Sequence, residues 1–291
     1  MSWLVWVGLL LAFLVLALTG VSAYGSKRWT DAMRALTRRL EAARLDDKAR
    51  SASAVRFDSR ELEGLPGPVQ RYFRAVLKEG QPIVSALTID MAGTFSMSAT
   101  AEHWKPFTSR QRVVTRRPGF LWDAQMSMLP GLLVRVVDSY IAGSGLLHAA
   151  ILGLVTVAKV SGGGEVARGE FMRFFAEAAW YPTALLPSQG VRWEAVDDRS
   201  ANATVVDGPL TLTLLFRFNH VGLIDSVRAE ARSAMVGNKV VMMPWECSLS
   251  SYEARDGMTV PITGEASWVR PEGRKPYFRG TITSLTYEFA P

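Results

Sequence analysis

Cysteine and histidine are scarce in this chain, with one cysteine and three histidines among 291 residues. A single cysteine excludes a disulfide-stapled scaffold and a zinc site built from thiolates. The histidines, His103, His148 and His220, lie far apart in sequence, so we expect no metal or catalytic site from them. With 48% hydrophobic residues, the chain is also too apolar to be disordered.

Charge is absent from residues 1–26 and concentrated directly after them. Residues 27–80 contain 13 basic and 8 acidic side chains, whereas residues 81–291 contain 20 basic and 19 acidic ones. The net charge of +6 is therefore mostly a local property of the segment after the N-terminus. Because the rest of the chain is nearly neutral, we do not expect it to bind nucleic acid.

An apolar run extends from Trp3 to Tyr24. As a helix it would be roughly 33 Å long, enough to cross a hydrocarbon core of about 30 Å. The alternative is a cleaved signal peptide, since small residues end the run at Ala23. However, no basic residue precedes the run, and it is longer than the apolar region of a typical signal peptide. We expect residues 1–26 to be a retained anchor that crosses the bacterial inner membrane once.

The flanking charges predict the orientation of this anchor. Basic residues follow the apolar run and none precedes it. The positive-inside rule therefore places the main domain in the cytoplasm. A periplasmic domain is the alternative, because large domains can be translocated regardless of charge. The basic residues closest to the run are Lys27, Arg28, Arg34, Arg38 and Arg39.

Residues 27–63 are predicted to be a basic juxtamembrane helix and a linker. The helix is expected over 27–48, where apolar residues recur at spacings of four and three. Three roles remain open for it: a stalk or a helix packed on its own domain, a helix lying on anionic lipid, or a coiled coil. Another short amphipathic helix is expected at 69–77. The stripe in 27–48 consists of Trp29, Met33, Leu36, Leu40 and Ala43.

From about residue 84 the hydrophobic period changes to two, which is typical of strands. The clearest strand is Leu210–Phe218. Turn dipeptides separate such runs, and strands joined by tight turns pair antiparallel. One helix, at 170–180, interrupts the strands. We therefore predict an α+β fold: an N-terminal transmembrane helix, then a curved antiparallel sheet over 64–291, a half-barrel or barrel covered by short helices. Further strands are expected at 87–98, 110–117, 120–127 and 134–141, and turns at Asp207-Gly208, Val221-Gly222, Gly237-Asn238, Asp256-Gly257 and Glu272-Gly273.

Motifs of known chemistry are missing. The glycine-rich turn 161–164 lacks the Gly-Lys-Ser/Thr ending of a phosphate-binding loop, and no Gly-x-Ser-x-Gly occurs. Cys247 is expected to pack in a strand. We expect no cofactor. An enzyme acting on a membrane-associated substrate remains an alternative, and so does a scaffold that recruits proteins at the membrane. The polar candidates for catalysis are Arg117, Asp123, Tyr140, His148 and Glu177.

Aromatic residues provide the most suggestive pattern. The predicted helices are too short to cover a broad sheet, so the sheet is expected to curl around an apolar interior. Large rings on its face indicate either an ordinary core or an aromatic-lined cavity. We therefore hypothesise a membrane-anchored binding protein, not an enzyme, that holds lipid or another apolar ligand. The candidate ligand-binding residues are Trp122, Trp180, Tyr181, Trp193, Trp245 and Trp268.

Three segments, 64–82, 116–123 and 167–187, resemble a bacterial family of uncharacterised membrane-anchored proteins. The second segment, Arg-Arg-Pro-Gly-Phe-Leu-Trp-Asp, also resembles the hairpins of the periplasmic lipoprotein-carrier family. That resemblance implies a half-open antiparallel barrel covered by helices that binds acyl chains. The chain departs from the carrier pattern, because an anchor replaces the cleaved signal and no lipid-attachment cysteine follows the apolar segment.

Overall fold

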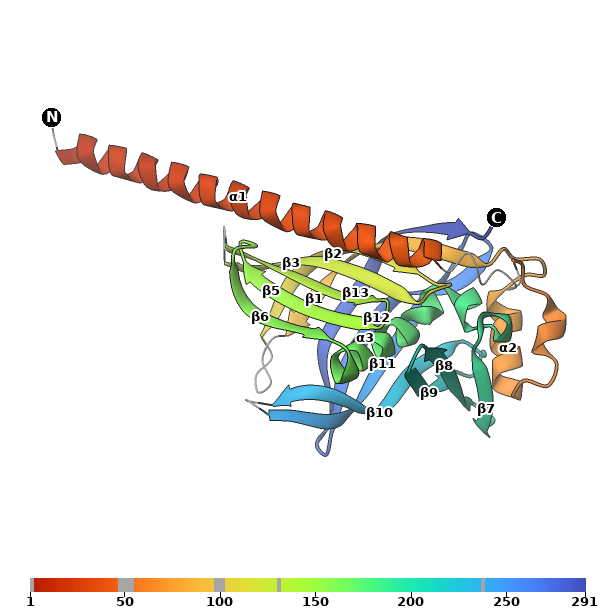
Figure 1. The fold of residues 1–291 in the computed structure, drawn as a ribbon. Helices are drawn as coiled ribbons and strands as arrows, with labels where there is room; N and C mark the ends of the chain where they lie inside the picture. The colour runs from red at the N-terminus through yellow and green to blue at the C-terminus, as the bar shows by residue number, and fades with distance from the viewer. Residues whose placement is uncertain (1–2, 47–54, 97–102, 130–131, 237–238) are drawn as a thin grey trace.

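The computed structural model describes residues 3–46, 55–96, 103–129, 132–236 and 239–291. A long N-terminal helix precedes one 13-stranded antiparallel sheet, and short helices accompany the sheet, so the fold is α+β (Figure 1). The strands are β1 (Val84–Ser96), β2 (Trp104–Val114), β3 (Gly119–Leu129), β4 (Leu132–Ile141), β5 (Ser144–Ile151), β6 (Val155–Gly162), β7 (Arg192–Asp197), β8 (Ser200–Asp207), β9 (Leu210–Phe218), β10 (Ile224–Val236), β11 (Lys239–Arg255), β12 (Met258–Arg270) and β13 (Gly273–Phe289).

Two meanders make up the sheet, whose strand order is β6-β5-β4-β3-β2-β1-β13-β12-β11-β10-β9-β8-β7. Pairing of β1 with β13 joins the two meanders. Among the described residues β6 and β7 are the two edges, so the sheet curls without closing into a barrel (Figure 1). The prediction of a curved antiparallel sheet is confirmed, in its half-open form.

The strands follow the predicted alternation. In β9, Leu212, Leu214, Phe216 and Phe218 are buried, while the side chains between them are exposed or half-buried. The four strands predicted between 87 and 141 correspond to β1–β4, although residues 97–98 of the first lie outside the described residues. Glycines at four predicted turns adopt a positive φ, as tight hairpin turns require. They are Gly208, Gly222, Gly257 and Gly273, whereas the predicted turn Gly237-Asn238 lies outside the described residues.

Both predicted covering helices are present. The first is α2 (Gly67–Val76), whose apolar stripe is buried. The second is α3 (Gly164–Ala176), which begins six residues earlier than predicted and continues into the 3-10 turn η3 (Glu177–Trp180). It contacts β4 and β5 in one meander and β9 and β10 in the other, so it covers the inside of the curl. The remaining 3-10 turns are η2 (Ser59–Leu62), η4 (Pro182–Leu185) and η5 (Pro187–Gln189).

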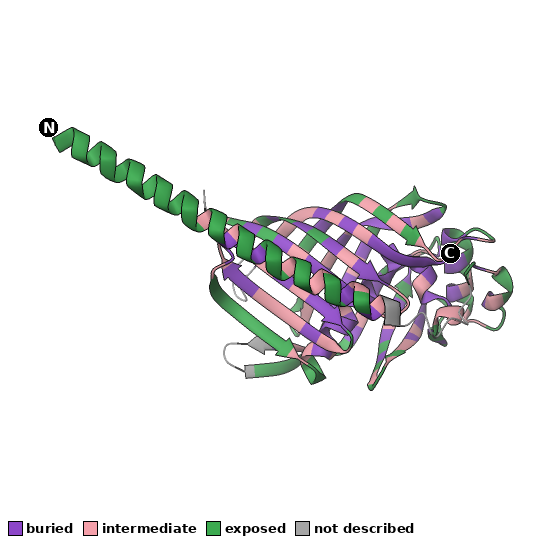
Figure 2. Ribbon diagram, turned by 45° about the horizontal axis from the view of Figure 1, so that its top comes forward, coloured by how far each residue is buried: buried purple, intermediate pink, exposed green. Residues whose placement is uncertain are grey.

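The long helix α1 (Trp3–Asp46) is continuous and has two different halves. Up to Tyr24 nearly every residue is exposed, and this half projects beyond the sheet (Figures 1 and 2). From Gly25 onward the helix packs on the outer face of β2, β3 and β4. The stripe predicted from spacing, Trp29 to Ala43, faces the sheet, where Trp29 and Leu40 belong to a small second core. This half is therefore packed on its own domain.

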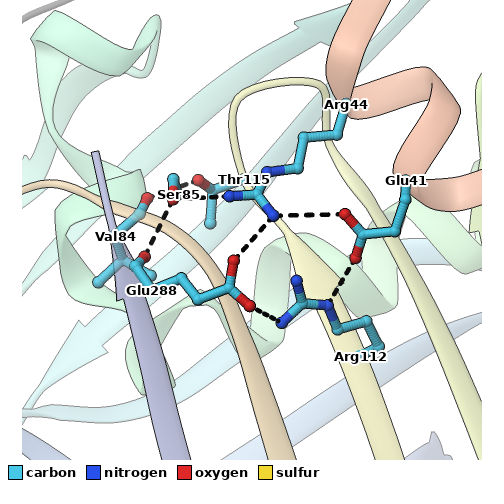
Figure 3. A network of polar contacts seen from close by, with 7 residues as sticks. All are labelled: Glu41, Arg44, Val84, Ser85, Arg112, Thr115 and Glu288. Atoms are coloured by element: carbon cyan, nitrogen blue, oxygen red, sulfur yellow. Dashed lines mark hydrogen bonds and ion pairs between the residues drawn. The ribbon is translucent and has the colours of Figure 1, made fainter. Parts of the chain in front are cut away.

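Polar contacts fix both ends of the packed half of α1. Near its start, the Trp29 indole N–H donates to Asp123 at 2.8 Å. Near its end, Arg112 on β2 pairs with Glu41 of the helix (2.8 Å) and with Glu288 on β13 (2.6 Å). Arg44 also pairs with both carboxylates, at 3.3 and 2.9 Å, which completes the network in Figure 3. The C-terminal end of α1 is thus tied to β2 and β13.

A substitution at Gly25 tests the packing of α1 on the sheet, because α1 leaves the sheet at this residue. A Cβ at Gly25 would lie 2.1 Å from the Leu152 carbonyl oxygen and 2.9 Å from Leu154 Cγ. We expect Gly25→Ala to lower the free energy of unfolding in detergent by about 1–3 kcal/mol through overpacking. Gly20→Ala is the matched control, since nothing lies within 4 Å of a Cβ there. Equal thermal stability of the two variants would contradict the docked arrangement.

Candidate functional site: the face between α3 and the sheet

One face of α3 packs rings against the inside of the curl. The Phe171 ring stacks on Tyr140 of β4, with centroids 4.9 Å apart. Phe175 meets Phe216 of β9 edge-on at 5.6 Å. All four side chains are fully buried in the main core. The apolar stripe of the helix therefore joins the two meanders.

The charged stripe of α3 is buried as well. Arg173 donates from Nε to Glu177 at 2.8 Å and from Nη1 to Asp138 of β4 at 2.8 Å. Gln111 of β2 accepts from Arg173 and donates to Glu177 at 2.6 Å. The Arg173 guanidinium also lies over the Trp122 ring, 4.7 Å from its centroid. We call Gln111, Asp138, Glu170, Arg173 and Glu177 the buried polar cluster.

Two carboxylate oxygens in this cluster are buried without a hydrogen-bond partner: Glu170 Oε2 and Asp138 Oδ1. Burial, together with the nearby negative charge of Asp138, raises the pKa of Glu170 to about 8. Burial likewise raises the pKa of Asp138, against the opposing effect of Arg173 and Arg232. Glu170 can therefore be protonated near neutral pH and exchange a proton there.

Five of the six predicted aromatic residues fall into two groups. Trp193 and Tyr181 are buried: Trp193 meets Phe73 of α2 edge-on at 6.3 Å, and the Tyr181 ring lies 5.6 Å from that of Phe174 of α3. Trp180 is buried too, and its indole N–H has no hydrogen-bond partner. Burial of these rings in a packed core means that a ligand at their positions would have to displace side chains.

The second group lies toward the sheet end from which α1 projects. Trp268 stacks on Tyr277 at 5.9 Å, and the Trp245 indole donates to the Tyr277 hydroxyl at 2.9 Å. Phe95 meets the Tyr277 ring edge-on at 5.7 Å, and Arg232 lies over Trp245 at 4.6 Å. We call Phe95, Trp245, Trp268 and Tyr277 the ring cluster. Trp245 is buried, but the other three are only half-buried.

Trp122, the remaining predicted residue, is buried beside Phe107.

Two hollows, of about 490 and 550 Å³, lie on the outer face of the sheet, and charged side chains are part of the lining of each. The first is lined by residues such as Asp90, Arg110 and Arg135, and the second by residues such as Glu265 and Arg279. None of the six predicted aromatic residues lines either hollow. The predicted ligand-binding residues are thus in or against the core, and their role remains a prediction.

The polar candidates for catalysis are divided between the two faces of the sheet. Tyr140 and Glu177 are on the inner face, within the core and the buried polar cluster. Asp123 and His148 are on the outer face, where both contact Trp29 of α1. Arg117 lies in the turn between β2 and β3. Within the described residues, no three His, Cys, Asp or Glu side chains are grouped so that they could hold a metal ion.

The i,i+3 and i,i+4 spacings put Glu170, Arg173 and Glu177 on one face of the helix, but spacing alone does not show that this face is buried. The missed partners are Gln111 and Asp138. Both occupy positions of their strands that face the core, and this is the signal that could have identified them. Burial also raises the pKa of the Cys247 thiol to about 12, which agrees with its expected packing role.

Comparison with known proteins places the chain in a family. A model of the family of unknown function DUF6920 matches residues 63–287, so the chain belongs to that family. This confirms the resemblance to an uncharacterised bacterial family. No curated protein matches the chain.

Several solved structures are similar at 8% sequence identity. A LolA superfamily protein from Nitrosomonas europaea aligns over 77% of this chain and 93% of its own, with a TM-score of 0.39. A β-barrel-like protein of the family DUF1849 from Brucella abortus aligns over 71% and 98%, with a TM-score of 0.27. A porin-like protein from Bacteroides uniformis aligns over 71% and 96%, with a TM-score of 0.23. We base no functional argument on likenesses of this size.

Glu170 predicts a distinct pH dependence of stability. Its pKa is about 8 in the folded chain and near the ordinary 4.5 when unfolded, so between these values only the folded chain keeps the proton. The free energy of unfolding should therefore fall as pH rises through this window, by at most about 1.4 kcal/mol per pH unit. Glu170→Gln should flatten this slope in urea unfolding between pH 5 and pH 8.

The control is Glu165→Gln, which changes an exposed residue at the start of the same helix. It should keep the wild-type slope. Identical slopes for the wild type and Glu170→Gln would show that Glu170 does not titrate in this window.

Proposed function

We propose that this protein is a membrane-anchored binding protein for lipid or another apolar ligand, held at the ring cluster on the inner face of the sheet. The observation that carries the proposal is the continuity of α1. Its packed half fixes the sheet, so its apolar half determines which end of the sheet lies nearest the bilayer. That end carries the ring cluster.

The apolar half of α1 supports a membrane anchor. It is the one helix, among the described residues, long and apolar enough to cross a membrane by length and composition, and no part of its apolar window is buried. Side chains such as Trp3, Leu10 and Leu16 are 72%, 58% and 72% exposed. So large an apolar surface is unfavourable in water, because water orders around it at a free-energy cost proportional to area. We propose that it spans the inner membrane once.

Charge supports the cytoplasm as the location of the sheet. Lys27 and Arg28 are exposed directly after the apolar half of α1. Positive side chains at the end of a span favour the cytoplasmic side. The periplasm remains the alternative location, and the ligand-binding proposal holds for either side.

The ring cluster supports an apolar ligand. Three of its four rings are only half-buried, although large rings gain most from complete burial. A bound chain would cover the exposed parts of Phe95, Trp268 and Tyr277. Arg232, above Trp245, would lie close to a polar end of that ligand. The cluster therefore offers both apolar contact and one cationic side chain.

Lipid recovery tests the proposal. Full-length protein would be purified in detergent, washed, and examined by native mass spectrometry and by solvent extraction. We expect a co-purifying lipid with the wild type and at least a several-fold loss with Trp268→Ala, which removes a half-buried ring of the cluster. Trp104→Ala is the matched control, because Trp104 is also half-buried but lies on the outer face beneath Arg279.

Two results would count against the proposal. Repeated recovery of folded protein without any lipid would leave the ring cluster without a ligand. Equal lipid loss in both variants would locate the bound lipid elsewhere, for example around α1. An enzymatic or scaffold role would then be the alternatives to pursue.

A further inference from the structure

We propose that the protein touches the membrane at a second place, through the starts of β6 and β11. This inference rests on the proposed anchor and names the lipid surface as the partner of these strand ends. We define the strand-end patch as five exposed apolar residues: Val155, Val157, Val240, Val241 and Met242.

The strand-end patch lies at the end of the sheet from which α1 projects. Leu152, in the turn that leads into β6, lies against Gly25, where the apolar half of α1 begins. The pairing of β5 with β4 and of β4 with β3 places the end of β3 and the start of β4 at this same end. Antiparallel register through β1, β13 and β12 brings the start of β11 to that end too. Figure 1 shows both strand starts on the side toward the N-terminus.

Exposure in this patch differs from the alternating burial seen in strands such as β9. Val240, Val241 and Met242 are consecutive and are 65%, 38% and 48% exposed, so both faces of β11 are apolar and uncovered there. β6 is exposed on both faces along nearly its whole length, with Val155 at 62% and Val157 at 50%. An antiparallel strand beside water normally carries polar residues on its exposed face. If an apolar medium surrounds these strand ends, their apolar side chains are no longer exposed to water.

A flat surface is the partner that fits this arrangement. β6 and β11 are far apart in the strand order and have seven strands between them, yet their starts share one end of the sheet. A protein partner bound along the edge of β6 would leave Val240 and its neighbours uncovered. The bilayer that holds α1 lies in the required position.

Charge at this end is complementary to anionic lipid. Lys27 and Arg28 are exposed where α1 meets the sheet. Lys275 is exposed on β13, paired with Trp268 near the β12–β13 turn. Basic side chains around an apolar patch are attracted to acidic headgroups and bring the apolar side chains to the acyl-chain boundary.

Spin labelling measures this contact directly. Cys247 is buried, so a single introduced cysteine can be labelled with little background. Nitroxides would be placed at Val155→Cys and Val240→Cys in the full chain, reconstituted into vesicles of phosphatidylcholine and phosphatidylglycerol. Accessibility to oxygen and to a water-soluble nickel complex reports membrane contact. Val221→Cys is the matched control, since Val221 is 59% exposed but lies in the β9–β10 turn at the opposite end of the sheet.

We expect labels at 155 and 240 to favour oxygen over nickel at least several-fold more than the label at 221. Equal, water-like values at all three sites would overturn the proposal. Immobilised labels with spin–spin broadening, but no gain in oxygen, would overturn it in favour of a second copy of the chain.

A label at Leu14→Cys separates the two proposals. Membrane-like values at 14 with water-like values at 155 and 240 would retain the anchor and reject the second contact. Water-like values at 14 would reject both. Mild valine-to-cysteine changes on exposed strand ends leave the core intact, so a folding defect does not confuse these outcomes.

Discussion

The docking of half of α1 on the outer face of the sheet is the contact on which the orientation of the molecule depends. A helix that is continuous from Trp3 to Asp46 cannot point its apolar half independently of its packed half. Trp29 and Arg112 hold the packed half at its two ends. As a result, one end of every strand faces the side to which the apolar half extends. The side chains at that end can therefore be related to the direction of α1, which would not be possible for a sheet without the helix.

Inside the curl, α3 makes two kinds of contact with the sheet, apolar and ionic, and they contribute differently to the fold. Its phenylalanines fill space, which many apolar residues could do. Arg173, in contrast, uses separate donors for Asp138, Glu177 and Gln111, so only one placement of the helix satisfies it. A buried ionic cluster adds little net stability, but removal of one partner is strongly destabilising because it leaves an uncompensated buried charge. The unpartnered oxygen of Glu170 is then a polar atom left over in a position that the rest of the cluster fixes.

Sequence patterns predicted what depends on local periodicity. The alternation in β9 and the stripe from Trp29 to Ala43 specify which side chains face a neighbour, and both are confirmed. They could not predict which neighbour is present. The spacing of Glu170, Arg173 and Glu177 suits a solvated helix as well as a buried one, because the i,i+4 pair is the same in both. For the same reason composition could not separate the packed Trp193 from the half-buried Trp268.

The loss of alternation at the start of β11 is as informative as its presence in β9. A strand with one face in the core and one in water needs two kinds of side chain, and the period of two records that difference. Where both faces of a strand meet the same medium, the alternation of apolar and polar residues disappears. The residue types in the strand then indicate whether that medium is apolar or aqueous. For Val240 to Met242 that composition is apolar, although the core does not cover these residues. At the start of β6 the residue types still alternate, but the apolar Val155 and Val157 are exposed. The reasoning by which we propose an apolar environment for the free half of α1 therefore applies to these strand ends as well.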